Sequence, residues 1–160
     1  MAIHVFSILC ENKPGVLMRI SRAFTRRQVN MDSVTVGLEP NGDARIIVLF
    51  KSDERMSNFL LKVLERLTEV KEVNPLRGET SLVREIALLK TKPLAGEDKE
   101  KTLLRIEEIG GRVLEVKEDA IIAEIHGDHE RIENVIQDLG DEVLEEVARS
   151  GQVYISKQFE

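Results

Sequence analysis

The stretch from Ile8 to Val36 constrains the fold most, because its hydrophobic spacing changes from that of a strand to that of a helix and back. Residues 3–9 are rich in Ile, Val and Phe, as in a strand, and residues 29–38 alternate like a second strand. Between them lie the turn Asn12–Gly15 and apolar residues with helical spacing, namely Val16, Leu17, Ile20, Ala23 and Phe24. The stretch therefore predicts a strand, a Pro-Gly turn, a helix and a strand, in that order.

The pattern continues as far as residue 76. A turn at Pro40–Asp43 precedes a β-branched strand at residues 44–50, which predicts a hairpin. Ser52 and Asp53 offer oxygens that cap a second helix, whose apolar stripe is Met56, Leu60, Val63, Leu64 and Leu67. A short strand at residues 72–76 completes the order β-α-β-β-α-β, which is ferredoxin-like. Two helices then cover one face of an antiparallel sheet, and a partner chain is the simplest cover for the other face.

The second half repeats this order after a polar linker, Gly78–Ser81. Its predicted strands are 82–89, 112–116, 120–125, 143–148 and 152–155, and its two helices carry the stripes Leu103, Ile106, Ile109 and Ile132, Val135, Ile136, Leu139. We therefore predict an α+β fold with two ferredoxin-like βαββαβ units. The first domain is expected at residues 1–78 and the second at residues 82–160.

Composition narrows the class of protein. The 160-residue chain has a net charge of −6, divided as +2 over residues 1–80 and −8 over residues 81–160, which argues against a nucleic-acid partner. Cys10 is the single cysteine, so an internal disulfide framework is impossible and a reducing, cytoplasmic setting is expected. No apolar run approaches the length of a membrane span, and the N-terminus has the pattern of a strand and not of a signal peptide.

Common catalytic motifs are missing from the sequence. It contains no G-x-G-x-x-G, no P-loop and no H-E-x-x-H, and no His is locally arranged to activate Cys10. His126 and His129 flank a strand end and a helix start with no cysteine nearby, which disfavours a metal site. The four arginines near the first helix lack interleaved aromatic residues, which favours a solvated or partner-facing surface over a nucleic-acid site. We expect neither catalytic residues nor metal ligands.

The turn Asn12–Gly15 has the chemistry of an amino-acid site. A helix start presents free N–H groups and a positive dipole to a carboxylate, and Gly15 allows close approach to the backbone. The amides of Asn12 and Asn30 each carry a donor and an acceptor for an ammonium and a carboxylate. Val16, Leu17 and Met31 would line an aliphatic pocket. On spacing alone, an ordinary Pro-Gly turn with two backbone-capping Asn residues is the favoured alternative.

A wider resemblance changes that balance. The motif E-N-x-x-G-x-L-x-R at the turn, followed by R-x-x-N-x-x-S-x-T-V, resembles the ACT domain of the small, regulatory subunit of acetolactate synthase (acetohydroxyacid synthase). LVREIALLK at residues 82–90 resembles the opening of that family's C-terminal domain, and EVARSG at residues 146–151 resembles a landmark near its end. The three landmarks occur in the family's order and span nearly the whole chain.

The resemblance implies a subunit without an active site of its own. Such subunits bind a catalytic subunit that uses thiamine diphosphate, Mg²⁺ and usually FAD; they raise its activity and confer feedback inhibition by valine. Their ACT domains pair side by side, with the ligand between the two chains. By position, Asn12, Gly15 and Asn30 match the family's ligand contacts, with Lys13, Pro14, Val16, Leu17 and Met31 as their neighbours. A homodimer that binds valine or another branched-chain amino acid is therefore expected.

Three other classes remain as alternatives. A free-standing ACT-type amino-acid sensor would bind a ligand without stimulating a thiamine enzyme. An enzyme would need residues to carry chemistry, and the sequence offers none. A nucleic-acid module would bind in a salt-dependent way, which the acidic second half disfavours.

Overall fold

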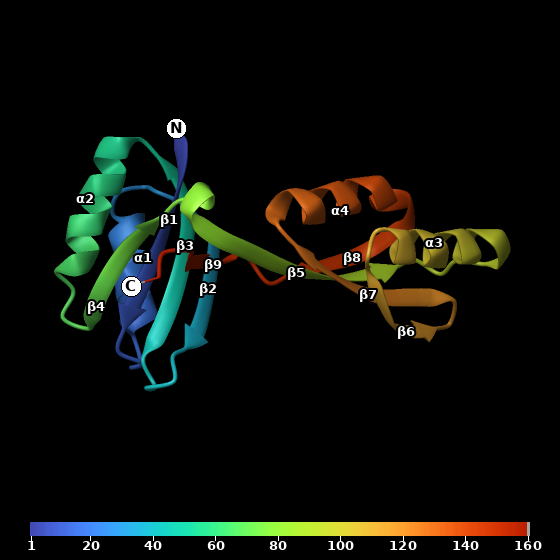
Figure 1. Cartoon of the computed structure of the whole chain (residues 1–160), viewed down its shortest axis with the longest axis horizontal. Helices are drawn as coiled ribbons and strands as arrows, with labels where there is room; N and C mark the ends of the chain where they lie inside the picture. Colours follow the sequence, from blue (N-terminus) through green and yellow to red (C-terminus); the bar gives the residue numbers. More distant parts are fainter. Residues whose placement is uncertain (160) are drawn as a thin grey trace. The chain divides into compact units, whose positions relative to one another are not determined.

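The computed structural model describes residues 1–159 and contains two compact units. Unit 1 comprises Met1–Leu82 together with the chain from Gln152 onward, and unit 2 comprises Val83–Gly151 (Figure 1). The sequence predicted a second domain that runs to residue 160. The structure instead returns the last strand to unit 1, because Tyr154 packs against residues of that unit.

Unit 1 has the order β1 (Ala2–Cys10), α1 (Val16–Thr25), β2 (Met31–Leu38), β3 (Ala44–Ser52), α2 (Glu54–Glu65) and β4 (Val70–Leu76). Its strands form an antiparallel sheet in the order β2-β3-β1-β4. This arrangement confirms the predicted ferredoxin-like unit. Each element lies within a few residues of its predicted position, because the change from strand to helix spacing marks the turns clearly.

The core of unit 1 lies between the sheet and the helices. Phe6 and Phe24 meet Phe50 edge to face, with ring centroids 4.9 and 5.1 Å from its own, and all three side chains are buried. Ile20 of α1 and Leu60 of α2 are fully buried against this cluster. Leu17 was predicted to belong to the apolar stripe of α1, but its side chain is 43% exposed. The inward face of α1 is narrower than the sequence suggested.

The back face of this sheet, opposite the helices, is covered in part from within the chain. Val5, Ile47 and Leu49 are at most 8% exposed and form a second cluster, with Leu76 and Tyr154 packed against it. Tyr154 belongs to β9 (Val153–Ser156), which pairs with β5. The sequence predicted that a partner chain covers this face. Over these residues the cover is the protein's own last strand.

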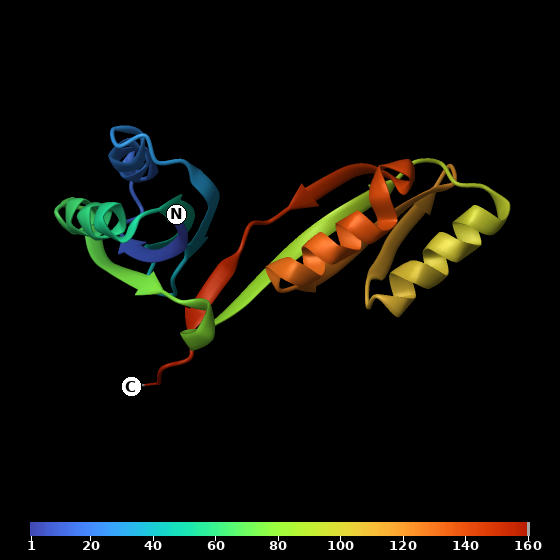
Figure 2. The ribbon, with the colours of Figure 1, turned by 90° about the horizontal axis from the view of Figure 1, so that it is seen from above.

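Unit 2 repeats the same topology with β5 (Ser81–Thr91), α3 (Gly96–Glu108), β6 (Arg112–Lys117), β7 (Ala120–Gly127), α4 (His129–Val143) and β8 (Leu144–Arg149), after the 3₁₀ turn η1 (Gly78–Thr80). Its sheet order, β6-β7-β5-β8, equals that of unit 1. Figure 2 shows α3 and α4 side by side over one face of this sheet, where Arg105 and Asp138 join the two helices at 2.7 Å. Ile86 and Leu88, on the other face, are 40% and 44% exposed.

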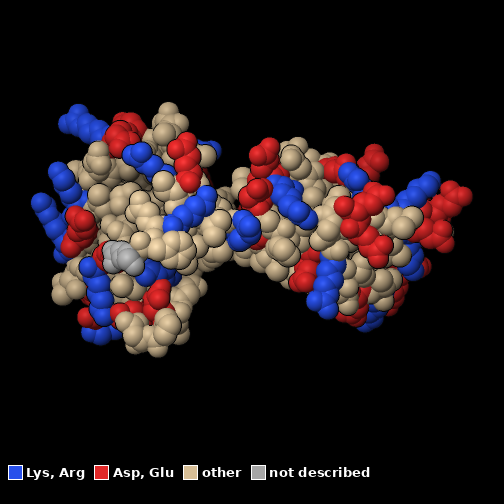
Figure 3. Space-filling model, in the orientation of Figure 1, with Lys and Arg blue, Asp and Glu red and all other residues tan. Residues whose placement is uncertain are grey.

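The acidic excess belongs to the second half of the chain, as the charge division indicated. Figure 3 shows Asp and Glu side chains over the α3 and α4 end of unit 2. Within residues 1–159, no helix combines the length and the apolar character that crossing a membrane requires.

Candidate functional site

The turn before α1 takes the conformation that its glycine permits. Gly15 is the N-cap of the helix and has φ 86° and ψ −8°, a left-handed conformation that residues with a Cβ rarely adopt. The Val16 N–H donates to the Lys13 carbonyl oxygen at 3.3 Å, and the Arg19 N–H donates to the Gly15 carbonyl oxygen at 3.1 Å. The first N–H groups of a helix lack helical acceptors, and Gly15 has no side chain to cap them. The helix start is therefore open to an anionic group.

A second set of contacts joins this turn to the residue that precedes β4. The Glu11 N–H donates to the Glu69 carbonyl oxygen at 2.9 Å, and the Glu69 carboxylate forms an ion pair with Arg19. Both contacts join the start of α1 to the turn after α2. No local sequence pattern points to Glu69, because its partners lie about fifty or more positions away in the chain.

The expected site residues at this turn differ in exposure. Asn12, Lys13, Pro14 and Gly15 are exposed, and no heavy atom lies within 4 Å of where a Cβ on Gly15 would stand. Lys13 pairs with Glu11 at 2.5 Å. The side chain of Val16 is buried in the core, whereas that of Leu17 is partly free. Leu17 is therefore available to a ligand, and Val16 acts as a support beneath the turn.

Asn30 and Met31 lie where the chain enters β2. Asn30 is exposed, and its Nδ2 donates to Asp32 Oδ1 at 3.0 Å. Met31 is half-buried against the core. The pairing of β2 with β3 is irregular between Met31 and Ser33, so Asp32 stands outside the ladder. Irregularities of this kind re-aim side chains next to binding sites. Asp32, which the sequence analysis did not name, orients the Asn30 amide.

A single chain does not bring Asn12 and Asn30 together. At one end of the sheet, Ala44 of β3 pairs with Cys10 of β1 and with Leu38 of β2. At the other end, Phe50 of β3 pairs with His4 of β1 and with Met31 of β2. The two asparagines therefore lie beyond opposite ends of the sheet, separated by roughly 20 Å at about 3.3 Å per residue of β1. If both contact one ligand, they come from two different chains.

The edge of unit 1 has the features of a chain–chain interface. β2 is the edge strand of the sheet, and its Val36 and Leu38 are 51% and 67% exposed. Leu17 and Met18 of α1 are 43% and 64% exposed. Exposed apolar residues beside a free strand edge favour pairing with another chain.

The cysteine and two of the histidines are the other candidate sites of chemistry from the sequence, and each has different surroundings. Burial, and then the charge of Asp43, raises the pKa of Cys10, whose side chain is fully buried, so the thiol stays protonated and unreactive. His129 contacts Glu85, while His126 is exposed. Over the described part of the chain, residues 1–159, no three His, Cys, Asp or Glu side chains are grouped to hold a metal ion.

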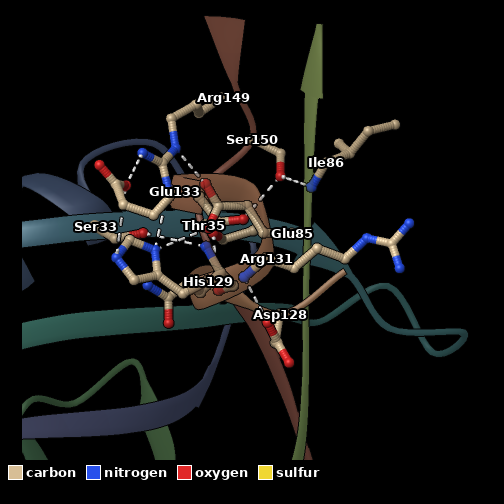
Figure 4. Close-up of polar contacts among 12 residues, drawn as sticks. Ser33, Thr35, Glu85, Ile86, Asp128, His129, Arg131, Glu133, Arg149 and Ser150 are labelled. Atoms are coloured by element: carbon tan, nitrogen blue, oxygen red, sulfur yellow. Dashed lines mark hydrogen bonds and ion pairs between the residues drawn. The ribbon is translucent and has the colours of Figure 1, made fainter. Parts of the chain in front are cut away.

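The two landmark segments of unit 2 meet in a buried ion pair (Figure 4). Glu85 is buried, and its carboxylate accepts from Arg149 Nε at 2.5 Å and contacts His129 Nδ1 at 3.2 Å. Ser150 Oγ accepts from the Ile86 N–H, and the Ser150 N–H donates to the Ile86 carbonyl oxygen, each at 3.0 Å. LVREIALLK and EVARSG are thus joined to each other by an ion pair and by hydrogen bonds to the Ile86 main chain.

Comparison with known proteins finds one family over both units. A family model described as the AHAS small subunit-like ACT domain matches residues 6–73, and one described as the small subunit of acetolactate synthase matches residues 84–158. A probable acetolactate synthase small subunit of Methanothermobacter thermautotrophicus is 32% identical over 155 residues, which cover 96% of this chain and 92% of the relative. An acetolactate synthase small subunit of Mycobacterium leprae is 30% identical, with 96% and 91% covered.

A solved structure agrees with these sequences. The crystal structure of the acetolactate synthase small subunit from Thermotoga maritima superposes with a TM-score of 0.90 at 32% identity and covers 99% of each chain.

Proposed function

Because this chain belongs to the acetolactate synthase small-subunit family, we propose that it regulates a separate catalytic subunit, raising its activity and making it sensitive to valine. The observation that carries the proposal is the open, left-handed Gly15 turn at the start of α1 in a chain that matches the family over both units. The catalytic subunit, and not this chain, would hold thiamine diphosphate, Mg²⁺ and FAD. The complex would work in the cytoplasm.

The effector would bind between two copies of unit 1. Its carboxylate would face the N–H groups at the start of α1, where the helix dipole favours a negative charge. Asn12 of one chain and Asn30 of the other would contact its polar groups, next to Lys13, Pro14 and Gly15. Leu17 and Met31 would contact the aliphatic side chain, with Val16 packed beneath the turn. Valine, leucine and isoleucine all fit an aliphatic lining of this kind.

Inhibition then follows from thermodynamic linkage. A ligand that contacts both chains favours one pairing geometry of the two ACT units. If the catalytic subunit prefers another geometry, valine and the catalytic subunit each weaken the binding of the other, with a coupling free energy of about 1–3 kcal/mol. This coupling is reciprocal, so the catalytic subunit must change the valine affinity by the same factor.

A calorimetric titration of the isolated protein with valine tests the site, with leucine, isoleucine and lysine as comparators. We expect saturable binding of a branched-chain amino acid and none of lysine. Asn12→Ala should lose most of this binding, whereas Asn58→Ala, which changes an exposed asparagine on α2, should keep it.

Gly15→Asp places a carboxylate where the effector's carboxylate would lie and should abolish binding. Its matched control is Gly96→Asp at the start of α3 in unit 2, because Gly96 also has a positive φ, 56°, and equally open space around a Cβ. Full valine binding by Gly15→Asp would rule out this site.

A free-standing ACT-type sensor is the second candidate, since the same turn would serve it. The two functions differ in one measurement, the activity of a catalytic subunit mixed with this chain. Stimulation supports the regulatory subunit, whereas valine binding without stimulation supports the sensor.

A further inference from the structure

The end of the chain forms a strap over unit 1, defined as residues 152–156, that contacts β2 directly. The Gln152 N–H donates to Ser33 Oγ at 3.4 Å, and Thr35 Oγ1 donates to the Gln152 carbonyl oxygen at 3.3 Å. Figure 4 labels Ser33 and Thr35 among the side chains with polar contacts. The backbone N–H and carbonyl groups of Gln152 are therefore both hydrogen-bonded to side chains of β2, two residues apart.

Tyr154 anchors this strap to the back face of the sheet. Its ring packs against the cluster of Val5, Ile47 and Leu49, and burial raises the pKa of its hydroxyl group. The Tyr154 hydroxyl donates to Gln152 Oε1 at 2.8 Å. The ring and the hydroxyl group together fix Gln152, so the groups that meet Ser33 and Thr35 are placed in advance.

The strap contacts β2 directly after an irregularity in its pairing with the sheet. The ladder of β2 with β3 is irregular between Met31 and Ser33, and β2 is the edge strand of the sheet. The strap contacts begin at Ser33, directly after this irregularity. They supply hydrogen bonds to β2 at the point where the ladder does not continue regularly.

We propose that Gln152 and Tyr154 are positioning residues for the effector site, because they fix the start of β2 and with it Asn30 and Met31. This inference rests on the proposed effector site and names what holds one side of it in place. Asn30 lies three residues before Ser33, and Asp32, which accepts from its amide, lies one residue before it. A site held in its binding geometry in advance binds more tightly, since less freedom is lost on binding.

The test removes one strap contact without removing apolar cover. Thr35→Val keeps the shape of the side chain and loses the donor to Gln152, whereas Thr35→Ser keeps the donor. Tyr154→Phe keeps the ring and loses the bond to Gln152 Oε1. Thr68→Val makes the same chemical change at an exposed threonine in the turn between α2 and β4 and serves as the control.

Two quantities are measured on the full-length chain: the valine dissociation constant by calorimetry, and amide hydrogen exchange of residues 31–36. We expect Thr35→Val and Tyr154→Phe to raise the dissociation constant by about fivefold to tenfold, as for the loss of one hydrogen bond. Exchange at residues 31–36 should become faster in both variants. Thr35→Ser keeps the hydroxyl donor and should therefore have wild-type values for both quantities. A change caused only by lower overall stability would not depend on the hydroxyl group in this way.

Unchanged valine affinity and unchanged exchange in Thr35→Val and Tyr154→Phe would overturn the inference. Faster exchange with unchanged affinity would also overturn it, since the strap would then hold β2 without serving the site. If the wild-type chain binds no branched-chain amino acid, the effector site itself fails. In that case wild-type exchange rates in both variants would show that the strap does not hold β2 either.

Discussion

At the scale of single residues, the Glu85 carboxylate of unit 2 is buried and paired with Arg149 and His129. Burial alone would raise the pKa of Glu85, but hydrogen bonds from Arg149 and His129, together with their charges, hold it below the usual value. Arg149 also contacts Glu133 at 2.8 Å, so the guanidinium joins two carboxylates. A buried charge is tolerated only when it is paired in this way.

This ion pair predicts acid sensitivity of unit 2. Folding lowers the pKa of the Glu85 carboxyl group, so its ionised form stabilises the folded state. This stabilisation is complete above the unfolded pKa of about 4.3 and is lost as the pH falls through the lower pKa of the folded state. Thermal unfolding between about pH 6 and pH 2.5 should therefore show a shallower fall in melting temperature for Glu85→Gln than for the wild type. Glu145→Gln, which changes an exposed carboxylate, should keep the wild-type slope. Parallel curves for Glu85→Gln and the wild type would contradict this account.

At the scale of elements, α2 and α4 each begin at an aspartate that caps the helix. Asp53 accepts from the Met56 N–H at 2.7 Å, and Asp128 accepts from the Arg131 N–H at 2.8 Å. Each aspartate has extended backbone and satisfies a helix N–H three residues on, as an N-cap does. The predicted cap of α2 is therefore confirmed, and Asp128 caps α4 in the same way.

Removal of either cap should destabilise the protein by a similar amount. We expect Asp53→Ala and Asp128→Ala each to lower the free energy of unfolding by about 1 kcal/mol, and the corresponding Asn variants by less, because Asn also caps. Urea denaturation followed by circular dichroism measures these differences. A loss above about 3 kcal/mol for either alanine variant would mean that the aspartate does more than cap its helix.

Local sequence patterns predict the elements of this protein better than the contacts between them. Strands and helices follow from local spacing, so the βαββαβ order of both units was predictable, as was the Gly15 turn. The contacts of Tyr154 with Val5 and Leu49, and of Gln152 with Thr35, join residues more than a hundred positions apart and have no local signature. For the same reason the placement of β9 and the supporting role of Glu69 could not be predicted.

Part of the candidate site could be predicted from the sequence and part could not. The turn at Gly15 is a property of consecutive residues and could be derived from them. The separation of Asn12 and Asn30 depends on strand register, which the sequence alone did not fix. Whether the eight expected residues bind an amino acid stays a prediction for the calorimetric test.

At the scale of the whole molecule, unit 1 is discontinuous in sequence, because unit 2 lies between its β4 and its β9. A chain that ends at Gly151 should therefore leave Val5, Ile47 and Leu49 uncovered. Loss of the Tyr154 contacts, worth about 2 kcal/mol of apolar burial, should lower the melting temperature by roughly 4–8 °C and increase binding of a hydrophobic dye. A chain that ends at Gln158 keeps β9 and should behave as the wild type. Equal melting temperatures for the two truncated chains would contradict the covering role of β9.

Discontinuity also sets the order in which a ribosome can finish the molecule. β1 to β4 emerge first, but the strand that covers their back face is made only after unit 2, about 70 residues later. At roughly 5–20 residues per second, that face stays bare for about 4–14 s in every nascent chain. During this interval Val5, Ile47 and Leu49 are open to contact with a second nascent chain or a chaperone, because Tyr154 is not yet present to cover them. Unit 1 can therefore be completed only after unit 2 has been synthesised.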